Sequence, residues 1–193
     1  MTVSVDNVEY LRAASSSGCF YTAATTETAP TDASTALGAG FTSLGLVSVD
    51  GLKMKAGNTE IDLEDWTGDE VLNILQKQEV EFTVKPLCFT DGNVLKERFG
   101  AANVTEVGGK VTALTIKTTQ LPNKMYVFEM LRRAGGKCRI VVLNGKVSGD
   151  VEYNFDPQNP TASDWTIKAQ PDSSGNKVKV YFAEAAGATG ATS

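Results

Sequence analysis

The sequence predicts a mainly β domain of the α+β class: a β-sandwich or barrel with one short flanking helix. Three observations lead to this class. Apolar and polar residues alternate with a period of two through much of the 193-residue chain. Glycine pairs and a Ser-Ser-Gly-Asn stretch separate the alternating segments. A single segment, TDGNVLKERFG, has a helical period instead.

The expected strands follow from the alternation. In residues 79–85, two valines and a phenylalanine alternate with Glu, Thr and Lys, which is typical of a strand with one buried face. Turns are expected at residues 108–109, 135–136 and 173–176. Strands are expected at residues 19–23, 44–49, 71–76, 79–85, 114–117, 125–130, 139–143, 147–155, 165–169 and 177–182.

The helix is expected at residues 92–99. Asp91 can accept hydrogen bonds from the free amides of the first turn, and Gly100 can end the helix in a left-handed conformation. Leu95 and Phe99 are four residues apart and form its core-facing side. The charged residues of the helix are then expected to face solvent: Lys96, Glu97 and Arg98.

The length fits one domain, residues 1–182, followed by a flexible Ala/Gly/Thr tail at 183–193. Residues 24–40 are Ala, Thr, Ser, Gly or Pro at fourteen of seventeen positions, too few apolar side chains for the segment to order itself. We therefore expect a long loop over residues 24–45 that neighbouring subunits hold in place.

The composition excludes several kinds of chemistry. There is no run of eighteen apolar residues and no signal-peptide pattern at the start, so we expect no membrane segment and folding in the cytoplasm. Cys19, Cys88 and Cys138 are far apart and fit reduced, buried thiols better than disulfides or a zinc cluster. The chain has no histidine and no phosphate-binding glycine loop, so we expect neither an enzyme nor a cofactor or metal site.

One acidic stretch, TEIDLEDWTGDEV (residues 59–71), is the only candidate constellation. Its glycine is misplaced for a calcium loop. Paired carboxylates for glycoside hydrolysis stay open, although any acidic loop offers such pairs. The favoured interpretation is a solvated acidic loop that leads into a strand at Val71. The carboxylates surround Trp66: Glu60, Asp62, Glu64, Asp65, Asp69 and Glu70.

Charge is divided unevenly along the chain. The first 70 residues carry a net charge of -8 and the remainder +3, and residues 109–146 hold eight Lys or Arg against one acid. A sequence pI near 4.8 disfavours tight non-specific DNA binding. Complementary faces, within one subunit or between copies, explain the division more simply.

Five stretches follow one another along the chain: PTDASTALGAGFTSLGLVSVDGL, DWTGDEVL, VEFTVKPLCFTDGNVLKERFGAANVT, LPNKMYVFEMLRRAGGKCRIVVLNGKVS and DSSGNKVKVYF. The Trp66-x-Gly68-Asp69 step is among their most distinctive parts. In this order, the stretches resemble the major tail proteins of long-tailed, siphovirus-type bacteriophages over roughly residues 18–182, while the tail beyond Phe182 has no family meaning.

The resemblance implies a tail tube subunit with a β-sandwich or barrel of the phage tail tube type. Copies would form homohexameric rings that stack into a hollow tube, through which double-stranded DNA passes without specific binding. It also implies a virion location, assembly in the host bacterial cytoplasm, and tape-measure, tail-tip and tail-terminator proteins as partners. Acids on the lumen would repel phosphates and let DNA slide.

The long loop and the acidic stretch are the expected contacts with adjacent subunits or rings: Thr31, Asp32, Leu37, Phe41, Leu44, Trp66, Asp69 and Glu70. We hypothesise that residues 60–70 meet a basic complementary face on a neighbouring subunit. That face would comprise Lys110, Lys117, Lys124, Arg132, Arg133, Lys137, Arg139 and Lys146. The alternative is that the acids pair within one subunit or only face water.

Two other functions remain open. The same core would serve as the inner-tube protein of a contractile tail or injection machine, with a sheath outside it. A monomeric carbohydrate-binding β-sandwich would use Trp66 or Trp165 as a stacking platform, although tryptophans in strands are more often core residues.

Overall fold

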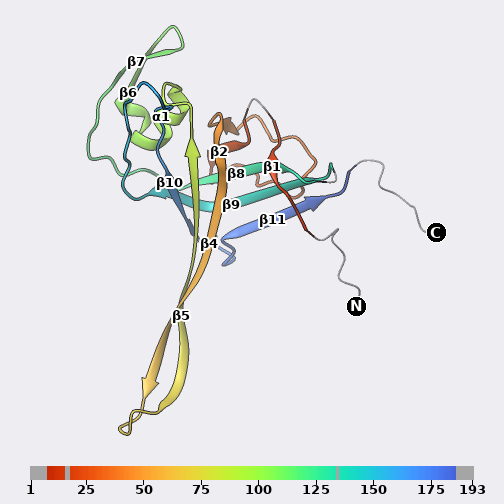
Figure 1. Ribbon diagram of the computed structural model, residues 1–193, viewed down its shortest axis with the longest axis vertical. Coiled ribbons are helices and arrows are strands. Elements are labelled where there is room, and N and C mark those ends of the chain that lie inside the picture. Colours follow the sequence, from red (N-terminus) through yellow and green to blue (C-terminus); the bar gives the residue numbers. More distant parts are fainter. Residues whose placement is uncertain (1–7, 16–17, 134, 186–193) are drawn as a thin grey trace, which may run out of the picture.

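The computed structural model describes residues 8–15, 18–133 and 135–185. Within them, the fold is mainly antiparallel β with one short α-helix, which confirms the predicted class. Nine strands share one sheet in the order β3-β2-β8-β9-β10-β5-β4, with β1 paired to β8 and β11 to β9 (Figure 1). The sheet strands are β1 (Arg12–Ala13), β2 (Phe20–Ala24), β3 (Thr42–Ser43), β4 (Val47–Glu64), β5 (Glu70–Pro86), β8 (Lys124–Leu131), β9 (Lys137–Ser148), β10 (Trp165–Gln170) and β11 (Val178–Ala183).

The sheet curls on itself around a single apolar core. Strand β9 pairs with β8 and β11 along its first half and with β10 along its second half, so it belongs to both sides of the curl. As a result Phe82 of β5 stacks on Phe128 of β8, with ring centroids 5.9 Å apart. Phe20 and Trp165 complete an aromatic centre and are fully buried. This half-closed arrangement is the structural form of the predicted sandwich or barrel.

The outer face of β2, β8 and β9 is also buried. Here Val127 and Val141 form a second cluster, against which Leu37 and Phe41 of the loop after β2 pack. Because both faces of these strands are covered, uninterrupted apolar runs replace the alternation in residues 125–128 of β8 and 140–143 of β9. The loop over residues 25–41 is therefore held by its own chain, whereas neighbouring subunits were expected to hold it.

The helix α1 (Gly92–Phe99) has the predicted bounds. Asp91 caps it by accepting from the amides of Asn93 and Val94, at 2.7 and 3.4 Å. Leu95 is buried, as expected, and Phe99 is half-buried. The prediction that Lys96, Glu97 and Arg98 face solvent was wrong. Glu97 is buried, and its neighbours Lys96 and Arg98 are half-buried.

Glu97 is only 5% exposed, and its carboxylate is held by two partners. It accepts from the Tyr126 hydroxyl at 2.6 Å and from Lys124 Nζ at 2.5 Å. A buried carboxylate needs such partners because desolvation is otherwise costly. Burial, followed by the nearby Glu97 charge, raises the pKa of Tyr126 well above its ordinary value, so the phenol keeps its proton as donor.

Several strand predictions need correction. Residues 115–117 are not a strand; instead β6 (Val104–Val107) and β7 (Lys110–Leu114) form a separate hairpin beside the helix, closed by the predicted turn at 108–109. The expected strands 139–143 and 147–155 are one strand, β9, which ends at Ser148. Gly145 gives the Tyr126 ring room to pack against β9, because a Cβ at this position would lie only 2.8 Å from the ring.

The remaining predictions concern turns, thiols and the tail. Turns lie as predicted at 135–136 and 173–176. All three cysteines are free thiols: Cys19 and Cys138 are buried, and Cys88 is half-buried. Burial raises the pKa of the first two thiols. Residues 186–193 of the expected tail lie outside the described residues. The one α-helix described has eight residues, too few to cross a membrane.

Candidate functional site

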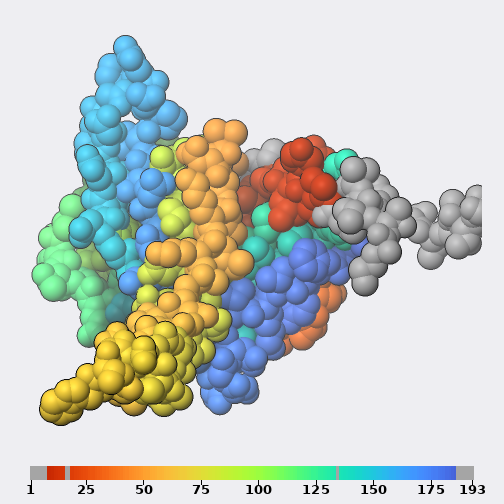
Figure 2. Space-filling model, turned by 60° about the horizontal axis from the view of Figure 1, so that its bottom comes forward, coloured from red at the N-terminus to blue at the C-terminus, as the bar shows by residue number. Residues whose placement is uncertain are grey.

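The acidic stretch lies at the end of a long β-hairpin. The predicted strand 44–49 was partly wrong, because residues 44–46 are not in a strand and only 47–49 belong to β4; the predicted strand 71–76 lies within β5. Strands β4 and β5 have 18 and 17 residues and run antiparallel. On the N-terminal side of Val80, β5 pairs only with β4 among the described residues, and every residue from Asn58 to Gln78 is exposed. We call residues 55–79 the arm. Figures 1 and 2 show it standing out from the rest of the molecule, at the end away from α1.

The tip of the arm is a turn built by Asp65. Its carboxylate accepts from the hydroxyl and amide of Thr67 and from the amide of Asp69. These hydrogen bonds, that of the Thr67 hydroxyl foremost, lower the pKa of Asp65. Gly68 follows with φ of +86°, a conformation that side chains disfavour. The tip thus uses one of the six carboxylates for local structure, and Trp66 is fully exposed on it.

Cross-strand pairing gives the arm two different faces. Ile61 lies opposite Ile74 and Leu63 opposite Leu72, and these four side chains are 49% to 55% exposed; we call them the aliphatic face. The acidic face lies on the other side, because successive residues of a strand alternate. It comprises Glu60, Asp62, Glu64 and Glu70.

Asn73 is the polar link on the acidic face, donating to Glu60 at 3.0 Å and to Asp62 at 2.7 Å. Among the described residues, no group of three or more Cys, Asp or Glu side chains is placed to hold a metal ion. The signal for this arm was present in the sequence: Glu-Ile-Asp-Leu-Glu at 60–64 alternates strictly, as a strand does.

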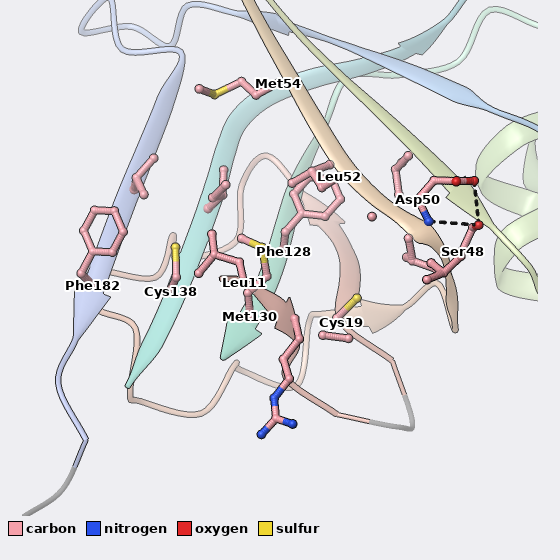
Figure 3. A pocket seen from close by; sticks show the side chains of 18 residues that line it. Leu11, Cys19, Ser48, Asp50, Leu52, Met54, Phe128, Met130, Cys138 and Phe182 are labelled. Atoms are coloured by element: carbon pink, nitrogen blue, oxygen red, sulfur yellow. Dashed lines mark hydrogen bonds between the residues drawn. The ribbon is translucent and has the colours of Figure 1, made fainter. Parts of the chain in front are cut away.

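An open apolar groove of about 1010 Å³ lies beside the base of the arm. Figure 3 shows its walls: β4 with Leu52 and Met54 on one side, and β11 with Phe182 on the other. Strands β8 and β9 form its floor with Phe128 and Cys138. Leu11, Val180 and Phe182 are 45%, 41% and 64% exposed, so the groove has apolar side chains that the described part of the chain leaves uncovered.

Both walls of the groove are edge strands. Within the described residues, β4 pairs only with β5, and β11 pairs only with β9. Their outer edges therefore present backbone donors and acceptors to whatever lies outside. Such open edges invite pairing with another chain.

The loop residues expected at subunit contacts are divided between surface and core. Thr31 is exposed, and Asp32 is half-buried within a turn of the loop. Leu37 and Phe41 are partly buried against their own sheet. Leu44 is fully buried in the core, so its side chain is not available to a neighbouring subunit.

Arg139 fastens this loop to the sheet. The guanidinium is only 3% exposed; it donates to the carbonyl oxygens of Asp32 and Thr35, both at 2.7 Å, and to the carboxylate of Glu129. Asp32 shapes the receiving turn by accepting from the Thr35 hydroxyl and from the amides of Ser34 and Thr35. These bonds lower the pKa of Asp32 to about 2.

The predicted basic residues do not form one face. Lys124 is bound to Glu97 at one end of β8, while Arg132 at the other end pairs with Glu9 and Glu184. Arg139 is buried under the loop. Lys146 is half-buried, whereas Arg133 and three lysines are exposed: Lys110, Lys117 and Lys137.

The two tryptophans differ in position. Trp165 is 1% exposed in the core, so it cannot be a stacking platform for a sugar. Trp66 is the exposed one, on a turn rather than in a strand.

Comparisons with known proteins place the chain only loosely. No model of a known protein family matches it, and no curated protein does. Among solved structures, it is similar to the tube-terminating cap of the anti-feeding prophage, with a TM-score of 0.41, 15% identity, and coverage of 85% of this chain and 88% of that one. It is also similar to a chain of the PVC sheath–tube complex of an extracellular contractile injection system, with a TM-score of 0.35, 11% identity, and coverage of 84% and 87%.

Proposed function

We propose that this chain is a structural subunit that assembles with copies of itself into rings, which stack into the hollow tube of a phage-like tail. The observation that carries the proposal is the arm. Its aliphatic face exposes Ile61, Leu63, Leu72 and Ile74 on a hairpin that leaves the rest of the chain. Two isolated strands are at best marginally stable in water, so an arm of this length needs a partner.

The open edges supply a route to a ring. Strands β9, β10, β5 and β4 form a four-stranded half of the sheet that ends at the free edge of β4. Six copies contributing four strands each would make a wall of about 24 strands, and barrels of 16 to 18 strands already enclose an aqueous channel. Pairing between edges of different copies is head-to-tail and closes into rings when the rotation permits.

The solvent-exposed face of these four strands would line the lumen of such a ring. Lys55, Glu81, Lys168 and Lys146 form one row across it, and Lys168 pairs with Glu81 at 3.0 Å. A lumen lined by this face would have mixed charge, in contrast to the acidic lining expected from the net charge. The pairing of Lys168 with Glu81 reduces its attraction for phosphates, and we expect double-stranded DNA to pass without firm binding.

The finer assignment follows the sequence resemblance: homohexameric rings in the tail of a long-tailed phage, assembled in the bacterial cytoplasm. Its partners would be tape-measure, tail-tip and tail-terminator proteins. The second candidate is the inner tube of a contractile tail or injection machine. Co-assembly with a sheath protein separates the two, because only the contractile tube needs an outer surface that binds sheath.

Negative-stain electron microscopy with light scattering at rising concentration tests the proposal. Six-membered rings or tubes with a central hole are the expected result, either alone or after addition of a tail-tip preparation. A chain that stays monomeric under both conditions contradicts it. Binding to a glycan array that is lost in Trp66→Ala would then favour the carbohydrate-binding alternative.

A further inference from the structure

The aliphatic face and the groove belong to one chain but cannot meet within it. Met54 is the last residue of β4 in the groove lining, and Ile61, the nearest residue of the aliphatic face, is seven residues further along the same strand. At about 3.3 Å per residue, the two are separated by roughly 23 Å of extended ladder. In Figure 1 the arm leads away from β9 and β11, which contribute to the groove, so no described part of the chain covers the aliphatic face and another molecule is the candidate cover.

Charge argues against a second arm as that cover. Residues 59–71 carry six carboxylates, and no Lys or Arg occurs between residues 56 and 76. Packing two aliphatic faces together would bring two such tips side by side, and like charges at close range are unfavourable. The groove carries a single carboxylate, Asp50, and otherwise mainly aliphatic and aromatic side chains.

We infer that the aliphatic face of one copy docks in the groove of a second copy, between its β4 and β11 edges. This inference rests on the proposed function, since it assumes self-assembly, and it names the surfaces that would carry it. Each copy has one arm and one groove, and the two surfaces are different. The contact is therefore head-to-tail, and every added copy presents a fresh arm and a fresh groove.

A matched pair of serine substitutions gives the first test. Leu63 and Leu75 are both on the arm and are 55% and 56% exposed, but Leu75 lies opposite Glu60 on the other face. Leu63→Ser is expected to raise the concentration needed for assembly about tenfold, and Leu75→Ser less than twofold. Equal effects, or no effect of either, would overturn the inference. Unchanged melting temperatures confirm that both variants fold.

Disulfide trapping gives the second test, with Leu63→Cys on the arm and Phe182→Cys at the groove. The background removes the native thiols by Cys19→Ala, Cys88→Ala and Cys138→Ala. An equimolar mixture of the two single variants is expected to form mixed dimers under mild oxidation, and the double variant a ladder of oligomers. Dimers from Leu63→Cys alone would indicate arm-to-arm contact and overturn the inference, as would the absence of any cross-link.

If that background does not fold, a benzophenone photo-cross-linker at position 63 of the native chain replaces it. Cross-links mapped by mass spectrometry to Leu11, Val180 or Phe182 support docking. Cross-links to other surfaces, or a small apolar molecule found in the groove by native mass spectrometry without cross-links, contradict it. Hollow tubes without these cross-links would refute the docking alone, whereas cross-linked chains that never form hollow rings would refute the tube function alone.

Discussion

Replacing Arg139 with glutamine is expected to release the loop over residues 25–41 from the sheet. The arginine is 3% exposed and donates to two loop carbonyl oxygens and to Glu129. Glutamine is too short to reach both sides. The loop would then keep its apolar contacts, Leu37 and Phe41 among them, but lose its two charged hydrogen-bond donors.

The magnitude follows from those two bonds. Hydrogen bonds to a charged group contribute about 1.5–3 kcal/mol each, so losing both weakens the attachment by at least about 3 kcal/mol. Glu129 loses its partner too, but its side chain is 24% exposed and water can replace the guanidinium, so we add nothing for it. At about 1.4 kcal/mol per factor of ten, the loop should open roughly a hundredfold more often.

Amide hydrogen exchange measures this opening directly. The amides of Thr35 and Phe41 are hydrogen-bonded within the loop, to Asp32 and to the carbonyl of Gly38, so their exchange should accelerate about a hundredfold. Arg132→Gln is the control, because it removes an arginine that follows β8 and pairs with Glu9 and Glu184, outside the loop. Acceleration below threefold in the loop, or equal acceleration at every amide of the sheet, would refute the reasoning.

Three further predictions concern the core and the loop turn. Tyr126→Phe leaves the buried Glu97 without its hydroxyl donor and should lower the free energy of unfolding by about 1.5–3 kcal/mol, measured by urea denaturation. Gly145→Ala should cost about 1–3 kcal/mol in the same assay because its Cβ meets the Tyr126 ring, whereas Gly57→Ala, in open space, should be nearly neutral. The pKa of Asp32 is about 2 in the folded protein, against about 3.9 in the unfolded chain. The stabilisation that the ionised carboxylate gives is therefore present above about pH 4 and is lost as the pH falls through about 2. An NMR titration of the loop amides should show this step, and Asp32→Asn should abolish it.

Local signals were sufficient for the elements that depend on neighbouring residues in the sequence. The helix at 92–99 has its cap, its Leu95 contact and its glycine end within ten residues, so its bounds could be predicted. The turns at 108–109, 135–136 and 173–176 likewise depend on local residues. The burial of β8 and β9 on both of their faces could not be predicted, because one face is covered by a loop that is distant in sequence.

The errors have identifiable physical causes. Glu97 was expected in solvent because an isolated carboxylate avoids burial, and the compensating Tyr126 and Lys124 lie 27 to 29 residues away. The prediction of a solvated loop before Val71 was wrong. It rested on the many acidic residues, although the alternation at 60–64 is typical of a strand. The apolar side chains of the arm were not recognised as a face, since cross-strand register is not visible in one strand alone.

In the proposed assembly, strand β4 would fix the order in which subunits are added. Its first residues, from Val47 to Met54, form a wall of the groove, and the same strand continues without interruption of pairing into the arm from Leu52 to Leu63, apart from one bulge. Fixing the arm of a subunit therefore restrains the wall that the next subunit must use. A wall already restrained costs less conformational entropy to occupy. Each bound copy would prepare the site for the one after it, so elongation should be cooperative and a lone pair of subunits short-lived.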